Sequence, residues 1–198
     1  RTRGGIEKNL QRKKKEYDEL PAKKKGEYDL ETLKNPYADS RILFGDPGTE
    51  VKRALVGIDI TGGEALLADR LSEKGQKIDL LIGHHPEGSA LANLADVMDL
   101  QIDVHSLSGV PVTVAEGIME NRIGEVRRRF APVNHFQAVD TDRLLNIPFI
   151  TLHTATDNLV YAYLKNLVAE KKPETVGEVI EMLKEVPEYK EAARLLVG

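Results

Sequence analysis

Three short runs of apolar and β-branched residues each lead into a segment with the pattern of a helix. The runs cover residues 53–60, 78–83 and 147–152. Short runs without regular polar alternation are typical of strands that are buried on both faces of a sheet. Helices between successive strands favour parallel pairing with right-handed crossovers. The alternation therefore predicts an α/β fold with a largely parallel or mixed sheet flanked by helices.

Turn residues and weaker apolar patterns outline the elements around these strands. The segment 35–48 holds two prolines and two glycines, so we expect a loop around one short strand there. Helices are expected over 1–20, 28–34, 64–74, 89–99, 112–130, 134–145, 159–170 and 174–186. The helix over 89–99 would place four residues on its inner face: Leu91, Leu94, Ala95 and Met98.

Charge is unevenly distributed along the 198 residues. Residues 1–25 contain ten Lys or Arg and four Asp or Glu, a net charge of +6, whereas the whole chain carries −4. The rest of the chain therefore carries −10, which indicates a basic arm on an acidic body. We expect a basic helical N-terminal arm over 1–35 and an α/β domain over 36–172. A C-terminal helical segment over 173–198 is expected to begin a further region.

Composition excludes several kinds of chemistry. The chain has no cysteine, so disulfides, cysteine–zinc sites and thiol nucleophiles are excluded, and no serine lies in a GxSxG turn. Without a signal peptide or a long apolar run, we expect a cytoplasmic protein with no membrane contact. Nucleic-acid binding through the lysine runs at 13–15 and 23–25 is disfavoured, because few aromatic residues accompany them and the body is acidic.

Histidines and carboxylates follow the predicted strands. His84 and His85 come directly after the second strand, and His153 follows the third with Asp157 four residues later. Asp59 lies near the end of the first strand. Ligand sites of open α/β sheets lie outside the carboxyl ends of the strands. Imidazole and carboxylate groups are ligands of divalent metal ions, so the pattern predicts a metal site at this edge.

The adjacent histidine pair limits how such a site is built. Neighbouring side chains on an extended chain point to opposite sides, so the pair would serve two ions, or one ring would bind while the other orients a neighbour. Pro86 favours an extended conformation for His85. Asp157 has an alternative role, because Thr154 and Asp157 have the spacing of a helix capping box. Asp59 is open to three roles: ligand, hydrogen-bond acceptor behind a ligand, or helix-start residue.

The segments VGIDI, LLIGHHPEG and ITLHTATDN resemble the NIF-three-like proteins, also described as homologues of GTP cyclohydrolase I type 2. The resemblance covers about residues 35–171 and implies a dinuclear metal centre. His84 and His85 match its paired ligands, Asp157 matches its bridging carboxylate, and His153 matches a residue lining the site. The family takes a further His and an acidic ligand from a C-terminal region, whereas this sequence has no His after His153. The resemblance also implies a ring-shaped homo-oligomer, commonly a hexamer.

These features lead to two expected functions. The first is a metal-dependent hydrolase with two divalent ions and with His153 as acid or base. A heterocyclic ring, as in GTP cyclohydrolase type 2 by resemblance, and a phosphoester are both compatible substrates. Zinc, iron, manganese, cobalt and nickel are not distinguished by this ligand set. The second is a non-catalytic metal-binding scaffold or regulator that acts through partner proteins. Turnover of a substrate by the metal-loaded protein would separate the two functions.

Overall fold

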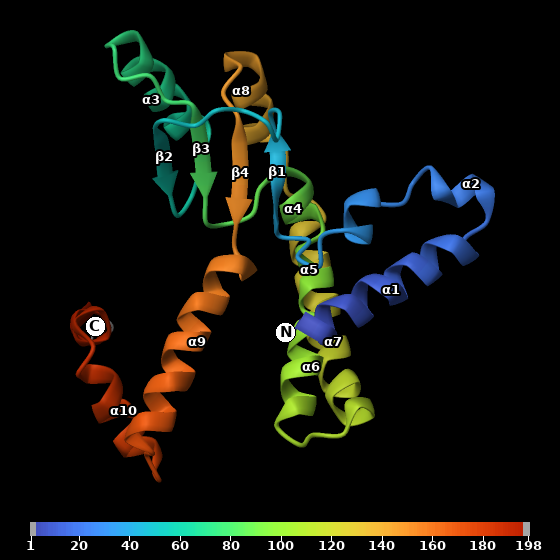
Figure 1. The fold of residues 1–198 in the computed structure, drawn as a ribbon, viewed down its shortest axis with the longest axis vertical. Helices are drawn as coiled ribbons and strands as arrows, with labels where there is room; N and C mark the ends of the chain where they lie inside the picture. The colour runs from blue at the N-terminus through green and yellow to red at the C-terminus, as the bar shows by residue number, and fades with distance from the viewer. Residues whose placement is uncertain (1–2, 196–198) are drawn as a thin grey trace. The chain divides into compact units, whose positions relative to one another are not determined.

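A computed structural model describes residues 3–195 of the chain (Figure 1). The chain forms two compact units, residues 1–155 and residues 156–198. The first unit contains the sheet and the N-terminal arm, and the second contains the helices that follow. The division of the chain at residues 35 and 172 stays a prediction, because compactness alone does not test which parts fold by themselves.

The first unit is built on a mixed four-stranded sheet with the order β1-β4-β3-β2. Its strands are β1 (Ser40–Phe44), β2 (Ala54–Gly57), β3 (Leu80–Gly83) and β4 (Phe149–Leu152). Strands β2, β3 and β4 are parallel, and β1 pairs with β4 in the opposite direction, as Figure 1 shows. The predicted fold class is confirmed, including the short strand expected in the loop 35–48.

The strands are shorter than the apolar runs that predicted them. Ahead of β2, the backbone N–H groups of Lys52 and Arg53 donate to the side chain of Asp79 instead of continuing the strand ladder. After β2, the chain turns at residues 58–60 into the helix α3. The start of α3 is fixed by a capping box in which Thr61 and Glu64 each bind the other's backbone N–H group.

Nine helical segments complete the described part of the first unit, and some begin or end where the sequence did not predict it. Their bounds are α1 Arg3–Glu19, α2 Ala22–Lys25, the 3₁₀ helix η1 Leu30–Leu33, α3 Gly62–Glu73, α4 Gly88–Ala92, α5 Leu94–Val97, α6 Asp99–Leu107, α7 Val112–Phe130 and α8 Gln137–Leu145. The single helix predicted over 89–99 is wrong. The chain breaks at Asn93 and Met98, and the Asn93 side chain donates to Asp29 at 3.2 Å.

One face of the sheet carries the hydrophobic core. Helices α3 and α8 pack together, and their small side chains lie against β3 and β4. The core consists of Ile60, Ala65, Ala68, Ile78, Leu81, Ala138, Val139, Ile147 and Phe149. The opposite face presents a row of β-branched residues that runs across all four strands in register: Ile42, Ile150, Ile82 and Val56. Ile42 and Val56, at the two ends of this row, are exposed.

The second compact unit is helical. Helix α9 (Thr154–Lys171) leads into it and is followed by α10 (Val176–Lys184) and α11 (Pro187–Leu195). Thr175 caps α10 by accepting the N–H group of Glu178, and Lys171 forms an ion pair with Glu185 at 2.7 Å. The prediction that α9 begins at residue 159 is wrong, since this helix begins directly after His153. Over residues 3–195, no helix combines the length and the apolar character needed to span a membrane.

Candidate metal centre

Hydrogen bonds to the neighbouring strand fix the backbone of the histidine pair. The N–H group of His84 donates to the carbonyl of Gly57 at 2.9 Å, and that of His85 donates to the carbonyl of Ile58 at 2.8 Å. The pair therefore extends the contact between β3 and β2 beyond the last strand residues. Gly83, just before the pair, is closely packed, since a Cβ atom there would lie 3.2 Å from Ile60 and 3.3 Å from Phe149.

His84, His85 and His153 converge at the carboxyl ends of β3 and β4. One potential ligand atom from each ring lies within 4.8 Å of the others. The ring centroids are 4.8 Å apart for His84 and His153, 5.2 Å for the adjacent pair, and 6.0 Å for His85 and His153. The expectation that the adjacent rings point apart is therefore wrong. The chain bends at these two residues, so they no longer alternate as in a strand.

Each of the three rings has its Nδ1 atom beside an oxygen acceptor. His84 Nδ1 lies 3.3 Å from the carbonyl oxygen of Leu152, and His85 Nδ1 lies 2.7 Å from Asp59 Oδ1. His153 Nδ1 lies 2.9 Å from Asp39 Oδ2. A neutral imidazole that donates from Nδ1 carries its lone pair on Nε2. In that tautomer, Nε2 would be the metal-binding nitrogen of each ring.

Asp39 is the site residue that the sequence did not reveal. Its side chain is fully buried, and Oδ2 also accepts from Thr154 Oγ1 at 2.6 Å and from the Thr154 N–H group at 3.3 Å. Burial alone would raise the pKa of Asp39, but the hydrogen bonds from His153 and Thr154 hold this pKa below its ordinary value. The antiparallel register pairs Ser40 with Leu152, so Asp39 and His153 are the next residues along.

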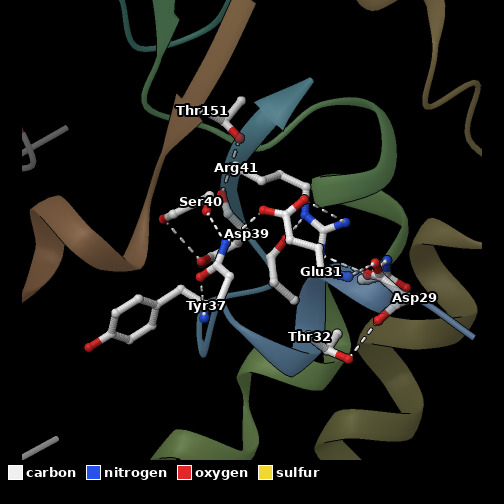
Figure 2. A network of polar contacts seen from close by, with 11 residues as sticks. Asp29, Glu31, Thr32, Tyr37, Asp39, Ser40, Arg41 and Thr151 are labelled. Carbon is white, nitrogen blue, oxygen red and sulfur yellow. Dashed lines mark hydrogen bonds and ion pairs between the residues drawn. The ribbon is translucent and has the colours of Figure 1, made fainter. Parts of the chain in front are cut away.

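An ion pair formed by the buried Arg41 side chain supports the turn that carries Asp39 (Figure 2). Arg41 Nη2 lies 2.8 Å from Asp29 Oδ2, and the guanidinium also lies 3.9 Å from Glu31. Arg41 Nε donates to the carbonyl of Ala38 at 2.9 Å. The Arg41 side chain is only 4% exposed, so this network anchors residues 38–41 against the η1 segment.

Two more carboxylates lie near the histidine pair. Asp59 is exposed and accepts from His85, which matches the hydrogen-bonding role that the sequence left open for it. Burial, with a smaller effect from the negative charge of Asp59, raises the pKa of Glu87 to about 7. The side chain of His85 is 49% exposed and that of His153 is 27% exposed, so the histidine cluster opens to solvent.

The other predicted residues are placed as follows. Asp157 lies in the first turn of α9, among the residues of the second compact unit, and its role as a ligand stays a prediction. Thr154 is the first residue of that helix, and its hydroxyl donates to Asp39. Outside the cluster, His105 lies in the last turn of α6, and His135 Nε2 lies 2.8 Å from the carbonyl oxygen of Phe130.

A similar fold occurs in a solved structure. The chain is similar to a crystal structure of a NIF3 superfamily protein from Sphaerobacter thermophilus, with a TM-score of 0.64 and 29% sequence identity. The chain has the NIF3 superfamily fold. The similarity covers 80% of this chain and 58% of the Sphaerobacter protein, so the chain spans less than two thirds of that protein's length. No protein-family profile and no curated protein matches the sequence.

The likeness agrees with the family resemblance that the strand-end motifs indicated. It concerns the fold, and it extends over most of the segment that the resemblance covered. His84, His85 and His153 of this NIF3-like chain lie at the sheet edge where α/β folds bind their ligands.

Proposed function

We propose that this NIF3-like chain is a divalent-metal-dependent hydrolase of a small molecule. The observation that carries the proposal is the cluster of His84, His85 and His153, whose potential ligand atoms lie within 4.8 Å of one another at the carboxyl edge of the sheet. Three imidazoles with one open coordination position form a common donor set of catalytic metal sites. The partial exposure of His85 and His153 leaves room for a substrate to approach.

The donor set fits a metal ion by distance. Imidazole nitrogens bind at about 2.0–2.1 Å, so two nitrogens that share a tetrahedral ion lie about 3.4 Å apart. A limit of 4.8 Å therefore asks for at most about 1.5 Å of adjustment between the farthest pair. Two ions would need a carboxylate ligand in addition to the three rings. We assign that role to Asp157, as the family resemblance implies.

The bound ions and the protein side chains would have different roles in hydrolysis. A bound divalent ion supplies Lewis acidity and lowers the pKa of its water towards about 7. His84 and His85 would hold the ions, with their rings oriented by the Leu152 carbonyl and by Asp59. His153 has two candidate roles, ligand or acid–base catalyst. Its distance from the other donor atoms favours ligation, whereas its bond to Asp39 suits either role.

The substrate class follows from resemblance, and so does the assembly. A hydrolysed heterocycle, as in GTP cyclohydrolase type 2 homologues, is our leading candidate for the substrate. We also propose a homo-oligomer, ring-shaped and hexameric by resemblance. The exposed ends of the β-branched row, Ile42 and Val56, support contact with another surface. Light scattering of the purified protein would give the oligomer size directly.

Metal content and turnover together test the function. Protein purified without chelator should contain zinc, iron, manganese, cobalt or nickel by elemental analysis, and His84→Ala, His85→Ala and His153→Ala should each lower that content. His135→Ala is the matched control, because His135 lies outside the cluster and donates to Phe130. Hydrolysis of purine nucleotides that depends on the added metal would support an enzyme. Stable metal binding without turnover would favour the scaffold function instead.

A further inference from the structure

We propose that Asp39 is a positioning residue for His153. Its buried carboxylate holds the His153 ring in the tautomer with hydrogen on Nδ1 and directs Nε2 towards the other two histidines. The proposal adds a residue behind the metal centre proposed above, and its functional meaning rests on that proposed function. The tautomer itself is a property of the metal-free protein, so it can be measured whether or not a metal binds.

The first step of the argument is the set of donors around one oxygen. Asp39 Oδ2 lies 2.9 Å from His153 Nδ1, 2.6 Å from Thr154 Oγ1 and 3.3 Å from the Thr154 backbone nitrogen. A backbone N–H group can only donate, and an ionised carboxylate can only accept. The oxygen is therefore an acceptor for all three groups, and the His153 nitrogen facing it must carry the hydrogen.

The second step is that residues 39 and 40 also fix the backbone of His153. Ser40 Oγ accepts the N–H group of His153 at 3.0 Å and that of Ala155 at 3.4 Å. Thr151 Oγ1 donates to the Asp39 carbonyl at 3.3 Å. The ring and the main chain of His153 are thus both tied to the start of β1, inside a paired sheet. Figure 2 shows Asp39, Ser40 and Thr151 together at this point.

The third step is burial. Asp39 has no exposed surface, so solvent does not compete for its hydrogen bonds. A carboxylate behind a metal-binding histidine sets the ring's tautomer and raises its basicity, and loss of such a partner costs about 10–100-fold in metal affinity. Among the three acceptors beside the rings, Asp39 is the buried carboxylate, whereas Asp59 is exposed and Leu152 offers a neutral carbonyl.

A purely structural role is the alternative, since Asp39 also binds the first residue of α9. Asp79 supplies a matched control. It is also buried, it accepts the N–H groups of Lys52 and Arg53, and it lies at the opposite, amino-terminal edge of the same sheet. Asp79→Ala should lower stability while leaving the His153 tautomer and metal affinity at their wild-type values. Asp39→Asn is the conservative variant, because its amide oxygen can still accept from His153 and Thr154.

The experiment measures the tautomer and the affinity separately. Long-range ¹⁵N–¹H NMR of the metal-free protein, at a pH where imidazoles are neutral, should show His153 protonated on Nδ1. Asp39→Ala should shift the ring to a mixed or Nε2-protonated state, and Asp39→Asn should retain the wild-type tautomer. Competition with a chromophoric chelator should give a zinc affinity about 10–100-fold lower for Asp39→Ala and an intermediate value for Asp39→Asn.

The outcomes separate this proposal from the function it rests on. An unchanged tautomer in folded Asp39→Ala would overturn the positioning role, as would an equal loss of zinc affinity in Asp79→Ala. If Asp39→Ala does not fold, an Nε2-protonated His153 in the wild-type protein would overturn the proposal, and so would a zinc affinity of Asp39→Asn equal to the wild-type value. A further outcome is that the wild-type protein takes up no metal while its His153 tautomer still changes in Asp39→Ala. That result would support the positioning role and contradict the metal-dependent function.

Discussion

The Nδ1 atom of His85 lies 2.7 Å from the Oδ1 atom of Asp59, a contact that joins the segment after β3 to the segment after β2. It resembles the contact between His153 and Asp39, but its environment differs. The side chains of His85 and Asp59 are 49% and 70% exposed, whereas Asp39 is fully buried. Water screens the exposed pair and offers His85 an alternative partner. The two carboxylates should therefore contribute unequally to the same centre.

Asp59→Ala should weaken zinc binding by less than about 10-fold, below the range expected when an oriented partner of a metal ligand is lost. The reason is that a water molecule can replace the Asp59 carboxylate at His85. Calorimetric titration of Asp59→Ala beside Asp39→Ala measures both affinities under one condition. A loss for Asp59→Ala larger than that for Asp39→Ala would mean that Asp59 is itself a metal ligand, one of the roles that the sequence left open.

Asp157→Ala should lower the metal content more than either His84→Ala or His85→Ala. A bridging carboxylate contacts both ions and offsets their mutual repulsion, whereas each histidine holds one ion. Elemental analysis of the three variants gives the order, and Glu170→Ala, near the far end of α9, is the control for a charge lost from the same helix. If Asp157→Ala retains full metal content while His85→Ala loses it, Asp157 serves the helix rather than the metal.

Sequence patterns predicted the convergence of the histidines that follow the strands directly. His84 and His153 are read from local sequence, because a parallel sheet brings the carboxyl ends of its strands to one edge. Asp39 could not be found in this way. Its place beside His153 depends on β1 joining the sheet next to β4 in the antiparallel direction, a pairing between residues more than a hundred positions apart. Local patterns do not encode strand order.

The errors in the predicted helices have a similar cause. The predicted start at residue 159 ignored partners from elsewhere in the chain for the first N–H groups of α9. Asp39 and Ser40, from the start of β1, accept the N–H groups of Thr154 and Ala155, so the helix begins at once after His153. The helix predicted over 89–99 had a suitable apolar face, but tertiary contact with Asp29 accompanies the break at Asn93.

Arg41→Met should lower the free energy of unfolding by about 3 kcal/mol, because it leaves Asp29 and Glu31 without their buried cationic partner. Both acids are about 30% exposed, which places the cost near the lower end of that for breaking a buried ion pair. Urea denaturation compares the variant with Arg70→Met, which removes an exposed pair with Glu73 and should cost at most about 1 kcal/mol. Equal costs for the two variants would contradict the anchoring role of Arg41.

Asp142, in α8, is fully buried, and neither of its carboxyl oxygens has a hydrogen-bond partner. Burial raises the pKa of this carboxyl from 3.8 to about 7, since the ionised form loses its hydration without gaining a partner. Between about pH 4 and 7 the folded state therefore retains a proton on Asp142 that the unfolded state has released. Folding stability contributed by this group must then fall as pH rises through that window, by at most about 1.4 kcal/mol per pH unit.

Asp142→Asn should remove this pH dependence, because the amide stays neutral in both states. The difference in unfolding free energy between Asp142→Asn and the wild type should shift in favour of the variant as pH rises from about 4 to 7, and should level off above that. Urea denaturation at several pH values measures the difference, which cancels the titration of all other groups. Asp140→Asn, which removes an exposed carboxylate paired with Arg143, is the control for the loss of a carboxylate from the same helix. A difference for Asp142→Asn that is constant over the whole window would mean that the Asp142 carboxyl gains a compensating partner when it ionises.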